Sequence, residues 1–584
     1  MSELKVIFSP LRFSAMLFLS IVLCSLAAGA EPIFSRQTER SLANPILWPS
    51  KPPAGCPFQP SKDIVGIYFT GRHNEYTHAD TWYPSWAADG NMYSPWTDGN
   101  VNGMGCSSAG PGARTGQAKI VGDDPLTLEI VNLGTETAAP APYGGRYPCG
   151  SLVYNGIWYY GTYCLMNEGG SIAADFKVGD HVYNWGVLGP FVGFRVSKDY
   201  GRHWTDTTHT PEKPLFNEPA KFGGKVKIGA PHFVDLGKNM EHSPDGKAYL
   251  VGMGAVDPDP KPRLANLSWI TGDEVYLARV TPSAENINDM SKYEFLGGQD
   301  KDGKPIWTND ISRIKPLVDW NNTCGCVTMT YNAPLRKYIL CVTDGWPTRG
   351  TMNTWIAESD QITGPWKLVV FMEKLGAQAY FVNIPSKFIS GDGRTAWLCY
   401  ANNFTGNQKI NPAGGRYGMC LQEINLFTPE QYDEYSKIKP VDPVKNDQNI
   451  ALKAKVTASS VYPKYHVEGA IDGVVGGFPG NTDNEWASKG ENVGAWIRLE
   501  WDAPETISRV ILWDRANNLD QITSGVLTFS DGATIRVGPL RDDATAGREI
   551  TFAPRTTRWL KFTVTGVKPK SPNIGLAEIA VFKK

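Results

Sequence analysis

One pattern occurs five times between residues 60 and 435: a short apolar strand, a tight turn and a second strand rich in aromatic residues. The turns are centred near Asp89-Gly90, Asn155-Gly156, Asp245-Gly246, Asn332-Ala333 and Asp392-Gly393. Asn-Gly and Asp-Gly dipeptides supply the positive φ angles that two-residue hairpin turns need. Each copy is therefore predicted to be a β-hairpin.

Further strand-like runs follow each hairpin, for example FVGFRVSKDYGRHWT and NTWIAESDQITGPWKLV. Repeats of about 60 to 90 residues, each forming a small antiparallel sheet, are typical of β-propeller blades. We predict an all-β chain with a five-bladed propeller over residues 31–436, closed by a strand at Ile64–Thr70 that joins the last blade. Six or seven blades would need irregular repeats outside this pattern.

Residues 449–584 alternate between apolar and polar positions in short runs such as AWIRLEW, SRVILWD and RWLKFTV. Alternation with a period of two indicates strands with one buried face, and its persistence here predicts a compact β-sandwich. The polar stretch 437–448 is predicted to be the linker between the two domains.

The first thirty residues have the layout of a signal peptide. Lys5 and Arg12 precede an apolar stretch from Met16 to Leu26, which ends on Ala28-Gly29-Ala30. An anchor would need about 18 or more apolar residues, so cleavage after Ala30 and secretion, to the cell exterior or periplasm, are predicted. No later segment is predicted to span a membrane.

The charge balance argues against a nucleic-acid partner. The 57 Lys and Arg residues offset 59 Asp and Glu residues, whereas a nucleic-acid binder needs a basic face. The 60 Gly, 42 Pro, 19 Trp and 24 Tyr favour a β-rich protein whose partner is carbohydrate. Without a phosphate-binding loop or a His-x-x-x-His pair, no catalytic cofactor is predicted; we expect a monomer.

Nine cysteines remain after the predicted cleavage. Cys149 and Cys164 are fifteen residues apart, as are Cys326 and Cys341, and a turn lies midway in both cases. Each pair is predicted to lie on the two arms of one hairpin, nearly opposite.

The blade pattern also predicts which polar residues meet. Residues before the first strand and after the second strand of each blade emerge on the same face of a propeller. Those before the first strands are Asp80, Arg146, Tyr147, His232, Asp319, Asn321 and Asn383, and those after the second strands are Asp98, Glu168, Asp257, Asp344 and Asn402. Trp82, Tyr83, Trp320 and Trp346 adjoin this funnel as candidate sugar-binding walls.

Glycoside hydrolysis needs two carboxyl groups in different environments, one protonated and one ionised, and this funnel offers several. Asp80 is the first candidate catalytic residue. Asp257 is the candidate acid, followed by Asp344 or Glu168.

Two short motifs resemble known propellers. Ser197 to Trp204 matches the S-x-D-x-G-x-x-W Asp-box of sialidase-like propellers, where the box is a structural turn. The DQITGPW run and the HADTWYPSWAADGNMY segment are similar in style to five-bladed family 43 glycosidases. That resemblance implies that Asp80 is the general base, whereas the Glu that such enzymes use as acid has no obvious counterpart.

The C-terminal series NIALKAKVTASS, EGAIDG, TDNEWASKG, AWIRLEWDAPETISRVILWDR and NIGLAEIAVF resembles the coagulation factor 5/8 type C, or discoidin-like, domain, the jelly-roll fold of family 32 carbohydrate-binding modules. The resemblance covers nearly all of residues 449–584. It implies a structural calcium ion between Asp472 and Glu578. It also implies a sugar site on loops at one end, with the candidates His466, Trp486, Trp513, Arg515 and Asn517.

Two other functions fit the same residues. A polysaccharide lyase acting on a uronate would use His78 or His232 with Tyr147 as base, and Arg146 to stabilise the carboxylate. A secreted lectin or adhesion protein would only bind. A secreted glycoside hydrolase, held near its polysaccharide by the C-terminal module, is the first prediction.

Overall fold

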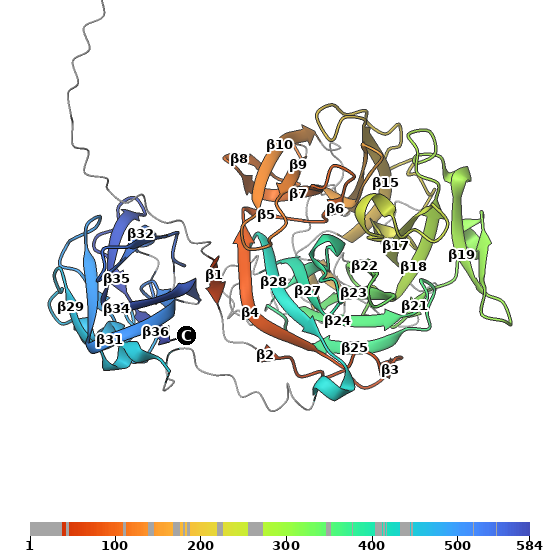
Figure 1. Ribbon diagram of the computed structural model, residues 1–584. Coiled ribbons are helices and arrows are strands. Elements are labelled where there is room, and N and C mark those ends of the chain that lie inside the picture. Colours follow the sequence, from red (N-terminus) through yellow and green to blue (C-terminus); the bar gives the residue numbers. More distant parts are fainter. Residues whose placement is uncertain are drawn as a thin grey trace, which may run out of the picture.

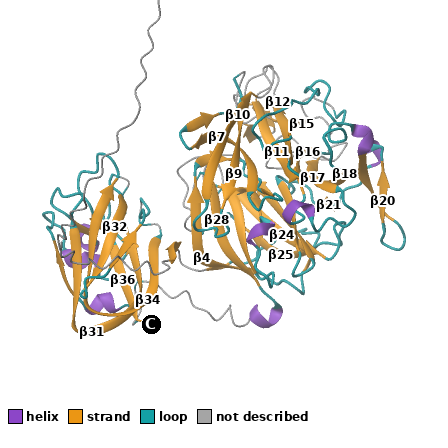
Figure 2. Cartoon of the chain, turned by 45° about the horizontal axis from the view of Figure 1, so that its top comes forward, coloured by secondary structure: helices purple, strands orange, loops and turns teal. Residues whose placement is uncertain are grey.

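The computed structural model is all-β, and its helices are limited to short turns (Figures 1 and 2). It describes residues 38–583 apart from 43–45, 109–111, 138–144, 167–175, 179–180, 184–186, 219–225, 255–271, 346–351, 377, 403–411, 413–414, 416, 433–443, 445–447, 518, 543 and 545. The predicted signal peptide and almost all of the predicted linker lie outside these residues. Within them, no helix has the length and apolar character needed to cross a bilayer.

Five sheets follow one another along the first part of the chain, and none closes on itself. The first contains β5 (His78–Asp80), β6 (Ser85–Trp86), β7 (Met92–Val101), β8 (Met104–Cys106), β9 (Arg114–Val121) and β10 (Glu129–Thr137). The second contains β11 (Gly145–Tyr154), β12 (Ile157–Met166) and β15 (Val187–Ser197), and β13 (Phe176–Val178) pairs separately with β14 (His181–Tyr183).

The third sheet contains β16 (Gly229–Phe233), β17 (Ala248–Gly254), β18 (Glu274–Val280), β19 (Tyr293–Gln299), β20 (Pro305–Thr308) and β21 (Val318–Asp319). The fourth contains β22 (Val327–Asn332), β23 (Lys337–Gly345), β24 (Met352–Ser359), β25 (Lys367–Met372) and the parallel strand β3 (Gln59–Pro60). The fifth contains β26 (Tyr380–Asn383), β27 (Thr395–Ala401), β28 (Met419–Leu426), β4 (Ile67–Tyr76) and β2 (Ile46–Leu47).

The five hairpins lie where the sequence predicts them, because every predicted turn falls between the leading antiparallel strands of one sheet. The strand predicted at residues 64–70 corresponds to β4, which begins three residues later and, as predicted, joins the last of the five sheets by pairing with β28 along most of its length. The fifth sheet is therefore built from both ends of the region 46–426.

The leading strands of the five sheets contact one another in sequence, β7 with β11, β11 with β16, β16 with β22 and β22 with β26. The fifth sheet then returns to the first, since Tyr380 donates a hydrogen bond to Asp80 (2.8 Å) and Asn383 donates one to the carbonyl of Trp82 (3.0 Å). A cavity of about 30 Å³ is lined by residues of all five sheets, among them Tyr83, Ser151, His232, Thr328 and Asn383. That volume is enough for one or two water molecules.

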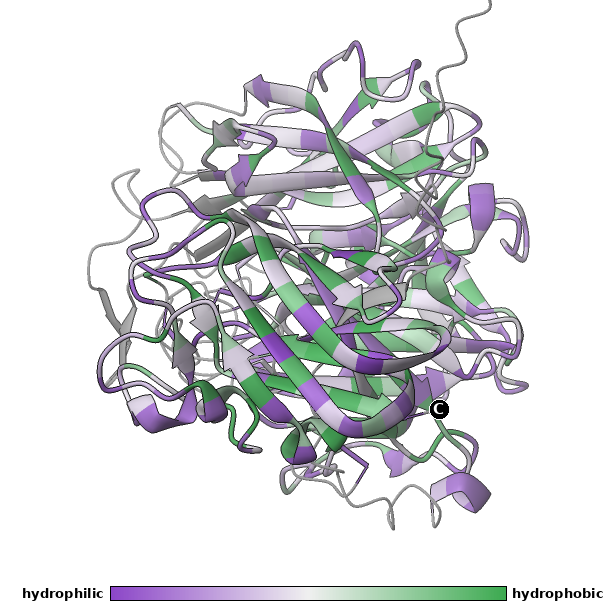
Figure 3. Cartoon of the chain, turned by 60° about the vertical axis from the view of Figure 1, so that its left-hand side comes forward, coloured by the Kyte–Doolittle hydropathy of each residue, from purple (hydrophilic) through white to green (hydrophobic). Residues whose placement is uncertain are grey.

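The C-terminal residues form a separate apolar core between Ile450 and Val581. Its strands are β29 (Lys455–Ala458), β30 (Trp486–Ala487), β31 (Trp496–Trp513), β32 (Ile522–Phe529), β33 (Thr534–Val537), β34 (Gly547–Val567), β35 (Gly575–Leu576) and β36 (Glu578–Lys583). Burial alternates along β32 and β34. Figure 3 shows hydrophilic and hydrophobic residues following one another along the strands of the chain. The period-two pattern thus gives strands with one face in the core.

The paired cysteines are not opposite each other, contrary to the sequence-based expectation. Cys164 pairs in register with Arg146, and Cys341 pairs with Thr328. Each pair is therefore offset along its hairpin by two or more residues, beyond the Cα separation that a disulfide accepts. None of the nine cysteines in the described residues is in a disulfide bond.

A short strand joins the two parts of the molecule. β1 (Thr38–Leu42) pairs with β34 over its whole length and with β4 at Ser41 and Leu42, so one sheet runs through both parts (Figure 1). Arg541 of the C-terminal part also forms an ion pair with Glu75 of β4 (3.2 Å). The strand that follows the predicted signal peptide thus fixes the C-terminal domain against the fifth sheet.

Deleting residues 31–43 is expected to release this junction, because β34 and β4 lose the backbone hydrogen bonds of their shared strand. The maximum dimension measured by small-angle X-ray scattering should increase. A shorter deletion, residues 31–37, keeps β1 and is the matched control, for which no change is expected. Identical scattering of the two deletions would contradict a fixing role for β1.

Candidate functional site

A group of buried polar residues lies where the first and fifth sheets meet. Asp80, the last residue of β5, is only 8% exposed. Thr81 donates a hydrogen bond to its Oδ1 (2.7 Å), and the Tyr380 and Tyr417 hydroxyls lie 2.8 and 3.1 Å from its Oδ2. Strand pairing between β5 and β7 also brings Asp98 to this place.

The backbone around Asp80 is unusual. Thr81, Asp98 and Phe381, each beside one of these contacts, have φ angles of +67°, +47° and +56°. For residues other than glycine such angles cost about 1–3 kcal/mol each, and a β-branched residue such as Thr81 adopts them rarely. Such strain persists where the surrounding structure imposes it, and it is frequent at functional sites.

The two carboxyl groups of this site have different environments. Burial, together with the charge of Asp98, raises the pKa of Asp80 to about 8. Burial also raises the pKa of Asp98, but Ser108 donates to that carboxylate from its hydroxyl (2.5 Å) and its backbone N–H (2.6 Å), which favours the ionised form. The pKa of Asp80 thus lies above neutral pH, whereas the two hydrogen bonds from Ser108 oppose the rise in the pKa of Asp98.

The predicted sugar-binding aromatics of the first sheet are buried. Trp82 is 1% exposed, and its Nε1 donates to the carbonyl of Ala79 (2.7 Å). Tyr83 stacks on His232 with ring centroids 3.8 Å apart. Both rings are buried, so neither presents an open face to a sugar.

His232 lies on the small cavity lined by the five sheets and is almost fully buried. Burial lowers its pKa to about 3, so the imidazole is neutral at physiological pH. Within the described residues its Nδ1 has no hydrogen-bond partner. Asn383, on the same cavity, donates to the carbonyls of Trp82 and Phe381, which holds the first sheet to the fifth.

Arg146 and Tyr147 are adjacent on β11, so their side chains point to opposite faces. The Arg146 guanidinium donates to Thr162 (3.1 Å), and burial lowers the pKa of Arg146. Burial, followed by the charge of the nearby Asp98, raises the pKa of Tyr147. The structure thus separates two residues that the lyase prediction places together.

The other predicted funnel residues are distributed as follows. Burial raises the pKa of Asp344 to about 7, and Asn353 donates to this carboxylate. Asn321 is exposed and accepts a hydrogen bond from Asn322 (2.6 Å). Asp257, Glu168 and Trp346 lie outside the described residues.

Sequence reasoning did not single out Tyr380 and Tyr417 as site residues, and it named Asp98 only as one funnel residue among many. The contacts of both tyrosines to Asp80 span about 300 residues of sequence. Tyr380 begins the first strand of the fifth sheet, and Arg146 lies at the start of the first strand of the second sheet. Because the sequence analysis chose Arg146 by that position, the same rule could have identified Tyr380.

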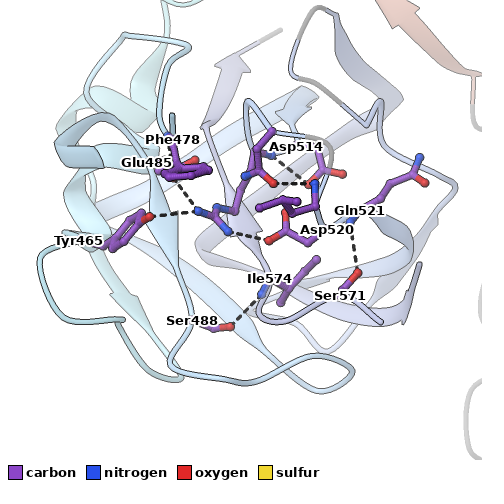
Figure 4. Close-up of polar contacts among 12 residues, drawn as sticks. Tyr465, Phe478, Glu485, Ser488, Asp514, Asp520, Gln521, Ser571 and Ile574 are labelled. Carbon is purple, nitrogen blue, oxygen red and sulfur yellow. Dashed lines mark hydrogen bonds and ion pairs between the residues drawn. The ribbon is translucent and has the colours of Figure 1, made fainter. Parts of the chain in front are cut away.

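A second polar group occupies the C-terminal domain (Figure 4). The Arg515 guanidinium donates to Glu485 (2.7 Å), Asp520 (2.6 Å) and the Tyr465 hydroxyl (3.3 Å). Arg515, Glu485 and Asp520 are at most 4% exposed, and burial raises the pKa of Asp520 to about 6. One guanidinium compensates two buried carboxylates here, and removal of one partner from such a group is strongly destabilising.

This group keeps unused hydrogen-bonding capacity near exposed apolar residues. Within the described part of the chain four of its buried polar atoms have no partner: Arg515 Nε, Glu485 Oε2, Asp520 Oδ1 and Asn517 Nδ2. The backbone N–H of Phe478 donates to Glu485 (3.0 Å), and the Phe478 ring is 40% exposed. Tyr462, also exposed, packs edge-on against Tyr465.

The remaining predicted module residues are in different environments. Trp513 is buried in an apolar cluster and lies against Gly547, where a side chain would clash. Trp486 is fully buried, and its Nε1 donates to the carbonyl of Ser460 (2.8 Å). His466 is exposed, with its Nε2 3.7 Å from Asp483.

Asp472 and Glu578 approach each other as a pair. Glu578 is fully buried and accepts a hydrogen bond from the backbone N–H of Gly473 (3.2 Å). Burial, followed by the charge of Asp472, raises the pKa of Glu578 to about 9. Its Oε1 has no hydrogen-bond partner among the described residues. Two carboxylates with an unused buried oxygen fit a hard cation such as calcium.

Comparisons with known proteins concern the C-terminal part. Residues 449–582 match a family described as a domain of unknown function (DUF7402). No curated protein matches the chain.

Similar solved structures include the lectin domain of lectinolysin complexed with Lewis B antigen, at 22% identity and a TM-score of 0.20, covering 24% of this chain and 99% of that one. The family 32 carbohydrate-binding module of NanJ from C. perfringens, in complex with galactose, is 19% identical at a TM-score of 0.20, over 23% of this chain and 98% of that one. Truncated AlyQ, with CBM32 and alginate lyase domains, is 18% identical at a TM-score of 0.18, over 22% of this chain and 31% of that one.

Proposed function

We propose that this chain is a secreted glycoside hydrolase, with its catalytic carboxyl groups in a five-bladed β-propeller and a carbohydrate-binding C-terminal module. The observation that carries the proposal is the pair of carboxyl groups in one strained site: Asp80, whose pKa burial raises to about 8, and Asp98, whose carboxylate accepts two hydrogen bonds from Ser108. Hydrolysis of a glycosidic bond requires such a pair.

The propeller is supported by two features. The leading strands of the five sheets contact one another in order and return to the first, and one axial cavity is lined by all five. In this arrangement each sheet is one blade. The site of Asp80 then lies on the funnel side, at the point where the ring closes.

In the proposed reaction, Asp80 gives its proton to the glycosidic oxygen as the bond to the anomeric carbon breaks. The ionised Asp98 either activates the water that attacks the anomeric carbon, as in inverting enzymes, or attacks that carbon itself, as in retaining enzymes. The family resemblance assigns Asp80 the role of base. We assign it the role of acid instead, because burial keeps its carboxyl group protonated at neutral pH.

The two alternatives have less support. A lyase would use Arg146 and Tyr147 on one substrate, and their side chains lie on opposite faces of β11. A lectin has no use for a buried pair of carboxyl groups with separated pKa values, which costs stability. The lectin remains the non-enzymatic alternative that the assay below distinguishes.

The C-terminal module is proposed to bind carbohydrate around Arg515. The buried atoms of Arg515, Glu485, Asp520 and Asn517 that lack a partner are suited to sugar hydroxyls. The exposed Phe478 ring, which adjoins Glu485, offers the flat apolar face that a sugar ring needs. We further propose export through the N-terminal signal peptide.

Calcium is proposed to bind between Asp472 and Glu578, where it would neutralise both carboxylates. Millimolar calcium is expected to raise the melting temperature of the C-terminal domain. At a calcium concentration one hundred times Kd, binding adds about 2.7 kcal/mol to the free energy of unfolding. Calorimetry with calcium and with a chelator measures the effect, and Glu578→Gln should abolish it. A melting temperature that is the same with calcium and chelator would contradict the site.

The proposed activity is tested by incubating the mature protein with plant and microbial polysaccharides while following reducing ends and ultraviolet absorbance. Reducing ends without new absorbance are expected, because hydrolysis creates no double bond. New absorbance on a uronate polymer would identify a lyase. Binding without either signal would identify a lectin.

A further inference from the structure

Two buried arginines share one face of the second sheet. Arg146 of β11 is 8% exposed, and Arg195 of β15 is 5% exposed. In the antiparallel register Arg146 lies opposite Cys164 of β12, and Arg195 lies opposite Tyr160 of the same strand. Residues four apart on a strand point to the same face. Both guanidiniums therefore leave the second sheet on the same side.

This face of the second sheet packs against the first sheet. The Tyr160 hydroxyl donates to the carbonyl of Gly116 of β9 (2.8 Å), and Arg195 donates to the hydroxyl of Thr115 of the same strand. The Arg195 guanidinium also lies over the Tyr160 ring, 4.0 Å from its centroid. The charge of Arg195 is thus enclosed between two sheets, among hydroxyl groups and an aromatic ring.

Neither arginine has an anionic partner within the described residues. The printed polar contact of the Arg146 guanidinium is to the Thr162 hydroxyl (3.1 Å), and the Nε atoms of Arg146 and Arg195 have no hydrogen-bond partner there. Burial, and to a smaller extent the like charge of Arg195, lowers the pKa of Arg146. The two cations therefore repel each other in a place where water screens them poorly.

The carboxylates around this pair lie at the surface. Asp206 is near enough for its charge to act on Arg146, and Glu212 is near enough to act on Cys164. Both are exposed, and in the part of the chain that the structure describes neither forms an ion pair with Arg146 or Arg195. A hydrated carboxylate at this range compensates a buried cation only weakly.

Arg279 shows how the same chain treats an arginine with partners. It also lies over an aromatic ring, 3.8 Å from the centroid of Trp307, but it pairs with Asp245 (3.0 Å) and Glu294 (2.8 Å). Buried charges are normally compensated in this way, because an isolated charge in the interior is costly. Arg146 and Arg195 depart from this rule together.

We propose that a small oxyanion, such as a sulfate or carboxylate group, binds between Arg146 and Arg195. The planar guanidinium presents parallel N–H donors that match the oxygen atoms of such a group. The Thr162 hydroxyl, which accepts from Arg146, keeps its own proton to donate to the anion. The bound anion would compensate both cations and join the first sheet to the second. This site does not depend on the proposed hydrolase activity.

The test measures sulfate binding to the full mature chain by calorimetric titration, at an ionic strength held constant with sodium chloride. Arg146→Gln and Arg195→Gln each remove one cation, and Arg279→Gln is the matched control. Each of the first two is expected to weaken sulfate binding by about 10- to 100-fold, since one hydrogen bond to a charged group is lost. Arg279→Gln should bind sulfate like the wild type. Circular dichroism confirms that each variant is folded.

Two further measurements keep the test decisive if a glutamine variant does not fold. Arg195→Lys retains the positive charge but loses the planar fork, so it should bind sulfate more weakly than the wild type and remain folded. Crystals of the wild type grown with selenate, which replaces sulfate, should show an anomalous-scattering peak between Arg146 and Arg195.

Sulfate binding that is equal in the wild type, Arg146→Gln and Arg195→Gln, or selenate crystals without a peak between the two arginines, would overturn the inference. Sodium glucuronate distinguishes the sources of the anion. If it binds to the wild type and more weakly to both glutamine variants, the occupant is the acidic group of a sugar. If sulfate alone depends on the two arginines, the occupant is a free inorganic anion.

Discussion

Replacing Asp80 with Asn is expected to lower the rate of hydrolysis by about 10²–10⁴-fold while the chain remains folded. Asn has the size and the hydrogen-bonding capacity to stay between Thr81 and the two tyrosines, but it has no proton to give to the leaving oxygen. Initial rates on the best substrate of the polysaccharide panel measure the effect.

The same substitution is expected to stabilise the protein at alkaline pH. The folded-state pKa of Asp80, about 8, lies above its unfolded value near 4, so the folded state binds the proton more tightly. The stability of the wild type relative to Asp80→Asn is therefore highest below pH 4 and falls as the pH rises towards 8. Thermal melts at pH 5 and pH 9 compare the two.

Asp392→Asn is the matched control for both measurements. Asp392 is an exposed turn residue of the fifth hairpin, and its carboxylate accepts a hydrogen bond from the backbone N–H of Arg394. The side-chain oxygen of an Asn can accept the same hydrogen bond. Normal turnover in Asp80→Asn would refute the catalytic assignment. A melting temperature of Asp80→Asn that falls with pH in parallel with that of the wild type would refute the raised pKa on which the assignment depends.

Replacing Arg515 with Met is expected to destabilise the C-terminal domain by about 3–5 kcal/mol. Two buried carboxylates, Glu485 and Asp520, lose the cation that compensates them. Calorimetry of the full chain should show a lower transition for this domain. Binding to polysaccharide should be lost at temperatures at which the variant is still folded.

The loss should depend on pH. Without Arg515 the pKa of Asp520, which burial already raises to about 6, rises further above its unfolded value, so the variant is most stable in acid and loses stability as the pH rises. Arg498→Met is the control, because this half-exposed arginine pairs with the exposed Glu500 and should matter by less than about 1 kcal/mol. Equal transition temperatures for Arg515→Met and Arg498→Met would contradict the role of Arg515 in compensating the two buried carboxylates.

The local parts of the fold were predictable from the sequence. Turn dipeptides such as Asn155-Gly156 fix hairpins because few other residues adopt the required angles. The alternation along β32 and β34 identifies the buried face of the C-terminal domain. Even the closing strand was predicted, since an unpaired apolar strand at the start of the chain needs a partner.

The cross-sheet contacts were not predictable. Asp80 was identified by its position before a hairpin, but its protonation depends on Tyr380 and Tyr417, which only folding brings near it. Trp82 was assigned to a sugar because it follows Asp80, and its burial depends on how the first sheet packs on the fifth. The cysteine spacing was misleading, since the turn sets a register that places Cys164 opposite Arg146 and Cys341 opposite Thr328.

The central claim, hydrolysis at the Asp80 site, is tested most directly by mass spectrometry of products formed from a polysaccharide in heavy-oxygen water. Hydrolysis predicts one heavy oxygen atom in each new reducing end from the wild type and Asp392→Asn, and almost none from Asp80→Asn. Products that contain a double bond and no heavy oxygen, or equal labelling with Asp80→Asn, would contradict the account.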